Sequence, residues 1–299
     1  MKLKTHQANL LLLLTAVIWG GGFVAQRLGM QQLDPYIFNG FRFLIGALTL
    51  APVILLRKGK TQAGNTDLRK TLIIGFVAGL FLFFGATFQQ LGLVSTSAGK
   101  AGFITGLYVI IVPMLGIFWR DRAPLNTWIG AAFAVSGLYF LSVTQGFNFA
   151  PGDGYVLLGA FFWALHVQFI ARFSPRVDTI QFSFVQSLIT SLISFMIGFF
   201  VEEFSLENVI AAAVPIFYGG VISIGIAYTL QVIGQQNAKP TSAAIILSLE
   251  SVFAAFWGWL ILKEGLSLRM LLGSILMLIG MMISQFQYKN GEKSVQGVE

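Results

Sequence analysis

Long apolar runs recur along the whole chain, and short polar connections separate them. At about 1.5 Å of rise per residue, each run is long enough to cross a hydrocarbon core of about 30 Å. Backbone polar groups find no water in lipid, so such runs must be helical. The pattern predicts an all-α membrane protein with ten transmembrane helices. These are expected at residues 9–29, 35–56, 70–93, 96–119, 125–144, 153–172, 179–201, 208–235, 240–262 and 267–286.

The basic residues are unevenly distributed between the two sides that an alternating path defines. With the N-terminus inside, fourteen Lys and Arg residues fall in inner loops and three in outer loops. Short loops rich in Lys and Arg are typically cytoplasmic. Both termini are therefore expected in the cytoplasm. The net charge of +7 then needs no nucleic acid partner.

A weak internal repeat, with an offset of about 144 residues, relates the two halves of the chain. A spaced pair and a motif recur: Trp19 and Asp34 with Trp163 and Asp178, and STSAGKAGFITG (95–106) with PTSAAIILSLES (240–251). Five spans per half is an odd number, so the second half enters the membrane from the opposite side. Such inverted repeats are typical of secondary transporters with a central site. The alternative is that apolar helices resemble one another by chance. We expect five-helix repeats at 1–148 and 149–288 and a cytoplasmic tail at 289–299.

Several stretches resemble a known family: WGGGFVAQ, FRFLIGAL, TSAGKAGFITGLYVIIVP, PTSAAIILSLESVFAAFWGWLILKE and GSILMLIGMM. Together they resemble the EamA-type transporters of the drug/metabolite transporter superfamily. The resemblance implies a bacterial inner-membrane carrier, often an exporter of amino acids or related metabolites. Many relatives have Glu-Pro where this chain has Glu250 and Ser251, so a proline kink is not expected there.

Glu250 lies ten residues past Pro240, about 15 Å from the inner face and so near the membrane midplane. An ionisable side chain at that depth costs about 2.5–3.5 kcal/mol on insertion scales and usually faces a cavity or a partner. Its functional interpretation is a proton site or a contact to a substrate amine. The alternative is a structural carboxyl bonded to a neighbouring helix. The repeat counterpart, around Thr105, has no carboxylate, which favours function.

Arg42 lies seven residues into the second span, about 10 Å below the outer face. Guanidinium binds carboxylates in a bidentate fashion, so Arg42 could hold a substrate carboxylate. The alternatives are a structural ion pair or snorkelling toward the surface.

Further polar and aromatic residues within the spans could contact a substrate or serve packing. His166 could be a proton relay or a hydrogen-bonded structural group, and Trp19 and Trp163 could be substrate platforms or packing residues. Gln90 and Gln235 could line a cavity or bridge helices. Lys100 could contact a substrate or snorkel toward the surface. The triplet Gly20, Gly21 and Gly22 could form a hinge for alternating access or a tight helix contact.

Composition removes other classes of function. The chain is 56% hydrophobic and only 10% charged, and it has no cysteine, which excludes disulfides and thiolate metal sites. It has no Walker loop and no GxSxG elbow, so we expect neither a cofactor, a metal nor an enzyme. We expect a secondary transporter that exports a small polar metabolite by alternating access, with protons as coupling ions. The alternative is a passive facilitator or channel of the same architecture. The oligomeric state stays open.

Overall fold

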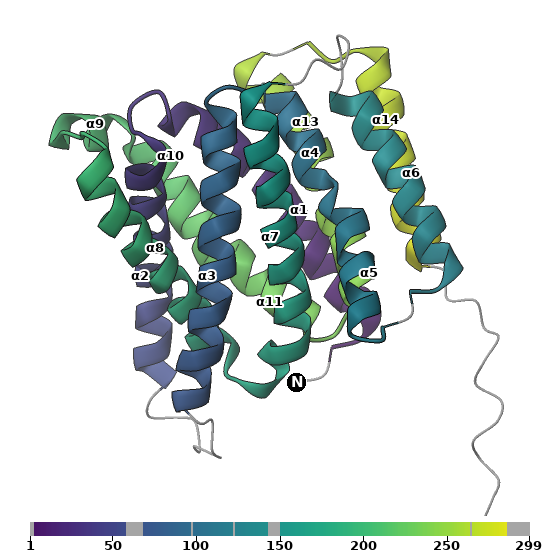
Figure 1. Cartoon of the computed structure of the whole chain (residues 1–299), viewed down its shortest axis with the longest axis horizontal. Helices are drawn as coiled ribbons and strands as arrows, with labels where there is room; N and C mark the ends of the chain where they lie inside the picture. Colours follow the sequence, from purple (N-terminus) through teal and green to yellow (C-terminus); the bar gives the residue numbers. More distant parts are fainter. Residues whose placement is uncertain are drawn as a thin grey trace, which may run out of the picture.

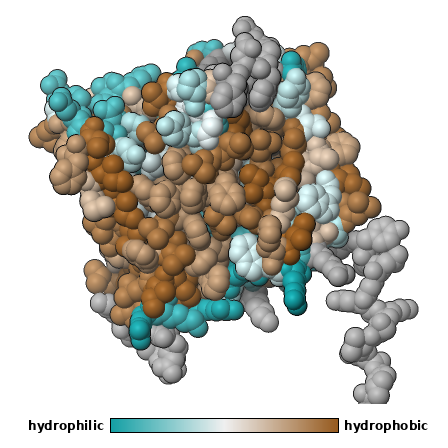
Figure 2. All heavy atoms as spheres, viewed as in Figure 1, coloured by the Kyte–Doolittle hydropathy of each residue, from teal (hydrophilic) through white to brown (hydrophobic). Residues whose placement is uncertain are grey.

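The computed structural model of the protein describes residues 3–57, 68–96, 98–121, 123–142, 150–263 and 265–285. Throughout these ranges the regular secondary structure is helical. Among the described residues, eight helical segments are long and apolar enough to cross a membrane, and two shorter apolar helices accompany them. Figure 2 shows a broad apolar band across the visible face, with polar residues toward its two edges.

The helices of the first half follow the predicted spans closely, with one interruption. They are α1 (Thr5–Gly29), α2 (Pro35–Arg57), α3 (Leu68–Leu93), α4 (Ala98–Gly106), α5 (Tyr108–Phe118) and α6 (Leu125–Ser142). The predicted span at 96–119 is thus two helices, α4 and α5.

The second half repeats this order and has more interruptions. Its helices are α7 (Pro151–Phe173), η1 (Ser174–Arg176), α8 (Thr179–Val201), α9 (Leu206–Ala211), α10 (Ala213–Phe217), η2 (Tyr218–Tyr228), α11 (Thr229–Gln235), α12 (Pro240–Leu247), α13 (Glu250–Leu262) and α14 (Leu268–Gln285). The predicted spans at 208–235 and 240–262 are therefore each divided.

The interruptions within 96–119 and 240–262 are tightened turns. The amide of Leu107 donates to the carbonyl of Ile104, and that of Leu249 to Ile246, each at 3.2 Å and three residues back. Such 3₁₀ turns often mark strain or function within a helix. The Ser248 hydroxyl also donates to the Ile245 carbonyl at 2.8 Å, a local bond that competes with regular helix geometry. The turn before Glu250 therefore forms in a stretch where Ser251, and no proline, follows Glu250.

The helix η2 is a π-helix, wider than the α-helices around it. It begins three residues after Pro215, which lacks the amide proton needed for a regular helical bond. π-Helical turns are rare and frequently occur at functional sites.

The two halves pack against each other rather than as separate bundles (Figure 1). The main contacts pair α1 with α13, α2 with α8, α3 with α7, and α6 with α14. In addition, α3 packs on α7 and α8, while η2, its counterpart in the second half, packs on α1 and α2. Figure 1 also shows that α1 begins at the edge marked N and that α7 runs in the opposite direction. Exchanged contacts and reversed direction are what two inverted halves produce.

Charged side chains at both edges cap helices and connect the two halves. Asp178 caps its own helix α8 by accepting from the amides of Ile180 and Gln181. In contrast, α2 is capped by Glu202 from the end of α8, which accepts from Tyr36 N at 2.9 Å and Ile37 N at 2.8 Å.

Toward the other edge, Arg172 at the end of α7 forms an ion pair with Asp121, which follows α5.

Candidate functional site

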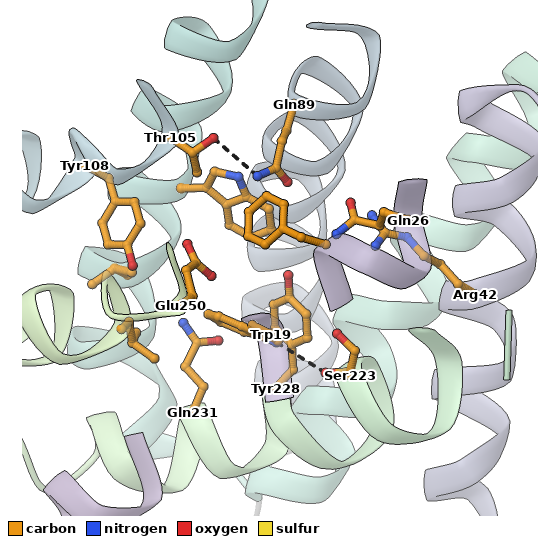
Figure 3. Close-up of a pocket in the computed structure, with 14 residues that line it drawn as sticks. Trp19, Gln26, Arg42, Gln89, Thr105, Tyr108, Ser223, Tyr228, Gln231 and Glu250 are labelled. Carbon is orange, nitrogen blue, oxygen red and sulfur yellow. Dashed lines mark hydrogen bonds between the residues drawn. The ribbon is translucent and has the colours of Figure 1, made fainter. Parts of the chain in front are cut away.

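A pocket between the two halves is lined by equal numbers of residues from each. They are Trp19, Phe23, Gln26, Arg42, Gln89, Thr105 and Tyr108 from the first half, and Trp163, Val167, Ser223, Tyr228, Gln231, Leu247 and Glu250 from the second (Figure 3). They surround about 560 Å³ of space free of protein atoms, part of it open to the surroundings.

Glu250 is the first residue of α13, directly after the tightened turn, and it faces this pocket (Figure 3). Its side chain is only 7% exposed. It forms no hydrogen bond or ion pair with any residue that the structure describes. An ionised carboxylate without a partner is expensive at such a site, so it needs a proton or a cationic ligand.

Arg42 reaches the same pocket from α2 and is 6% exposed. Its Nε donates to Asn39 Oδ1 at 2.9 Å, one turn earlier in the helix. Its Cζ lies 5.1 Å from the ring centre of Phe43 and 5.6 Å from that of Phe38. These contacts hold the guanidinium in place, while its two terminal nitrogens have no hydrogen-bond partner within the described ranges. Arg42 is therefore oriented to receive an anionic group.

Aromatic rings form the middle of the pocket. The rings of Trp19 and Tyr228 lie 4.7 Å apart, and Trp163 stacks on Tyr228 at 6.2 Å. The Trp19 indole donates to the carbonyl of Ser223 in η2 at 3.3 Å, which anchors α1 to the π-helix. Gly85 lets α3 approach Trp163, because a Cβ there would lie 3.1 Å from the indole ring. Both tryptophans therefore occupy the pocket from repeat-related helices.

Amides and hydroxyls line other parts of the wall. The Gln89 amide donates to the Thr105 hydroxyl at 3.3 Å, which joins α3 to α4. Gln231 Oε1 and the Tyr108 hydroxyl are buried with no hydrogen-bond partner among the residues that the structure describes. Such groups are normally satisfied, so a ligand or water is expected to complete them.

Three of the residues proposed from the sequence, His166, Gln90 and Gln235, lie outside the lining of the pocket. His166 is buried behind the pocket, with its Nε2 2.9 Å from Gln186 Oε1, and it packs edge-on against Trp163 and Tyr228.

Gln90 and Gln235 are buried and outside the lining. Gln235 donates to the Val167 carbonyl at 3.1 Å and so bridges α11 to α7. The neighbouring Gln89 and Gln231 line the pocket in their place. The side chain of Lys100 lies outside the described part of the structure.

The glycine triplet lies in an unbroken stretch of α1 and makes close helix contacts. A Cβ at Gly20 would lie 2.5 Å from the Cβ of Phe253, and one at Gly21 would meet the Tyr218 ring. The Tyr218 hydroxyl in turn donates to the Ile18 carbonyl at 2.9 Å. These contacts favour the packing interpretation, and the hinge stays a prediction.

Toward the edge that holds the N-terminus, apolar side chains close the pocket. The cluster comprises Leu12, Tyr108, Val112, Ala164, Val167, Ala243, Ala244, Ile246 and Leu247. Three of them, Tyr108, Val167 and Leu247, also line the pocket. Within the described ranges, no three His, Cys, Asp or Glu side chains are grouped to hold a metal ion. The site is thus a partly apolar chamber with one acid and one base.

Comparison with known proteins identifies the family. The model of the EamA-like transporter family matches residues 6–143 and again residues 150–285. The chain belongs to the EamA-like transporter family. It is accordingly a multi-pass membrane protein with a pocket among its apolar helices.

Relatives of this EamA-like chain carry transporter names. An "Uncharacterized transporter" of Archaeoglobus fulgidus is 31% identical over 94% of this chain and 86% of its own. The "Uncharacterized transporter YoaV" of Bacillus subtilis is 22% identical over 91% and 94%. The "Uncharacterized inner membrane transporter YedA" of Escherichia coli is 23% identical over 81% and 78%. A solved crystal structure shares the fold, with a TM-score of 0.76 at 19% identity over 93% of this chain and 96% of that one.

Proposed function

We propose that the protein is a secondary transporter that exports a small polar metabolite, an amino acid or a related compound, across the bacterial inner membrane by alternating access. One observation carries the proposal: Glu250 and Arg42, both buried and without an ion pair between them, face one pocket shared by the two halves. Buried charges of this kind mark substrate and ion pathways in membrane proteins.

The proposed topology has ten spans and both termini in the cytoplasm. The short helices α6 and α14 would complete the ten, because they pack against each other and are apolar. The repeats would be 1–148 and 149–288, followed by the tail at 289–299. A reporter fused to the C-terminus tests this topology, and a signal from the outer side would contradict it.

Glu250 is the proposed coupling site. Its buried carboxylate can be neutralised either by a proton or by the ammonium group of a substrate, and the two would compete for it. Export of the substrate would then be exchanged for inward movement of a proton. Without such competition, the same architecture would serve as a passive facilitator or channel.

Reconstituted vesicles test transport and coupling together. Vesicles would be loaded with a mixture of amino acids; efflux would be measured from the amino acids released into the medium, and proton uptake with an internal pH dye. We expect efflux accompanied by proton uptake, loss of the proton signal in Glu250→Gln, and no change in Glu207→Gln, an exposed acid remote from the pocket. Efflux without any pH response would favour the facilitator. Unchanged proton movement in Glu250→Gln would remove Glu250 from the mechanism.

A further inference from the structure

The acid and the base of the pocket lie at opposite ends of it. Figure 3 shows Glu250 beside Gln231, and Arg42 beside Gln26, with the rings of Trp19 and Tyr228 between them. Tyr228 lies between the two charged side chains, and no ion pair or hydrogen bond joins Arg42 to Glu250 in the described part of the structure. Two groups so placed cannot bind the same small functional group of a ligand.

Acceptors gather at the Glu250 end. Besides the carboxylate, Gln231 Oε1 and the Tyr108 hydroxyl, which can donate as well as accept, are buried there with no hydrogen-bond partner in the described part of the structure. An ammonium group has three donors and no acceptor, so it matches this end of the pocket. A ligand anion would meet repulsion there and would leave the acceptors unsatisfied.

The guanidinium of Arg42 supplies the charged donors at its end, where the Oε1 of Gln26 is also buried with no hydrogen-bond partner among the described residues. The Nε of Arg42 is occupied by Asn39, and the phenyl rings of Phe38 and Phe43 fix the plane of its guanidinium. The terminal nitrogens can then donate in parallel to the two oxygens of a carboxylate. Between the ends, the tilted pair of Trp19 and Tyr228 offers apolar ring faces and only a few polar atoms.

We propose that the substrate is an extended zwitterion, with its ammonium and its carboxylate at opposite ends of a short chain, as in an ω-amino acid or a dipeptide. This inference rests on the proposed transport function. The ammonium binds at Glu250, the carboxylate binds at Arg42, and the chain lies along Trp19 and Tyr228. An α-amino acid carries both charges on one carbon and reaches only one end at a time.

A ligand series tests the proposal on the purified, full-length protein. Quenching of tryptophan fluorescence would report binding, because Trp19 and Trp163 line the pocket. The probes are glycine, β-alanine, 4-aminobutanoate, 5-aminopentanoate, 6-aminohexanoate and glycylglycine. Affinity should rise from glycine to an optimum among the longer compounds by roughly tenfold or more, about 1.4 kcal/mol. If glycylglycine binds tightly and the ω-amino acids bind weakly, the extended zwitterion is a dipeptide.

Two variants assign the ends. The wild type should prefer 5-aminopentanoate to pentylamine, and Arg42→Gln should abolish that preference. The wild type should also prefer 5-aminopentanoate to pentanoate, and Glu250→Gln should abolish this second preference. Lys239→Gln, at an exposed position remote from the pocket, should keep both preferences. The fluorescence unfolding curve of each variant shows whether it is folded, and each preference is a ratio within one protein.

The outcomes separate this inference from the function on which it rests. If α-amino acids bind as tightly as the extended compounds, the inference is overturned while transport stands. If vesicles transport metabolites but no zwitterion of the series binds, it is overturned as well. If vesicles transport nothing, the proposed function fails.

Discussion

The contact between α1 and α13 at Gly20 predicts a large penalty for one added methyl group. In Gly20→Ala the new Cβ would lie 2.5 Å from Phe253 Cβ, 2.6 Å from Phe253 C and 2.7 Å from Ala254 N. Two of these atoms belong to the backbone of α13, so relief requires movement of the whole helix. Because α13 begins with Glu250, that movement would also displace the acid of the pocket.

The magnitude follows from two opposing effects. Overpacking of a well-packed contact costs about 1–3 kcal/mol, and the backbone atoms place this site at the upper end. Alanine is favoured over glycine in a helix by about 1 kcal/mol. Gly20→Ala should therefore lower the free energy of unfolding by about 1–2 kcal/mol. Gly102→Ala in α4, where a Cβ meets nothing within 4 Å, should raise it by about 0.5–1 kcal/mol.

Unfolding in mixed SDS micelles measures the difference, with the six tryptophans as the signal. Equal stabilities of Gly20→Ala and Gly102→Ala would refute the close contact of α1 with α13. Gly22→Ala tests the hinge, because its Cβ would lie 3.3 Å from Ser223 Oγ and can be accommodated. If Gly22→Ala is stable but transports slowly, the triplet serves as a hinge as well as a packing surface.

Three further predictions concern the edges and the pocket. Burial raises the pKa of Glu202 above its usual value despite its bonds to α2. The folded state then binds this proton more tightly than the unfolded state. The free energy of unfolding of the wild type, relative to that of Glu202→Gln, should therefore decrease as pH rises above about 4.3. Chemical unfolding at several pH values measures this difference. Asp121→Asn should change the unfolding free energy by less than about 1 kcal/mol, because the side chains of Arg172 and Asp121 are 25% and 49% exposed. The chain has no cysteine, so an introduced cysteine is the only thiol that can react. Thr105→Cys should react with an impermeant thiol reagent added outside cells, whereas Leu12→Cys in the closing cluster should not. The reverse pattern would contradict a pocket closed on the N-terminal side.

The helices could be predicted from the sequence, but the faces they present could not. Gln89 and Gln90 are adjacent in one apolar segment, yet only Gln89 lines the pocket. In a soluble helix the apolar stripe would reveal the buried face, whereas in a membrane the lipid side is as apolar as the core. The depth of Glu250 follows from counting residues, since rise per residue does not depend on which face is buried.

The widened helix η2 illustrates a second limit. A single helix was expected over 208–235, and its faces would then follow the period of about 3.6 residues. The π-helical geometry of Tyr218–Tyr228 changes that period, and it brings Ser223 and Tyr228 to the pocket. The sequence offers Pro215 as a warning of irregularity but does not give its form.

The repeat offers a reason for the single orientation that we propose for a substrate in the pocket. Trp19 and Trp163 are repeat counterparts, and both line the pocket, so the aromatic middle is shared by the two halves. The charged positions have diverged: Thr105 stands where the second half has Glu250, and Gln186, bonded to His166, stands where the first half has Arg42. Two identical halves would offer the same charges at both ends, and a zwitterion could then bind in either direction. With the acid contributed by one half and the base by the other, the two ends of the pocket differ, and reversing the ligand would bring like charges together at both. The double variant Arg42→Glu with Glu250→Arg should therefore weaken binding less than either single change, because it restores one favourable orientation in reverse.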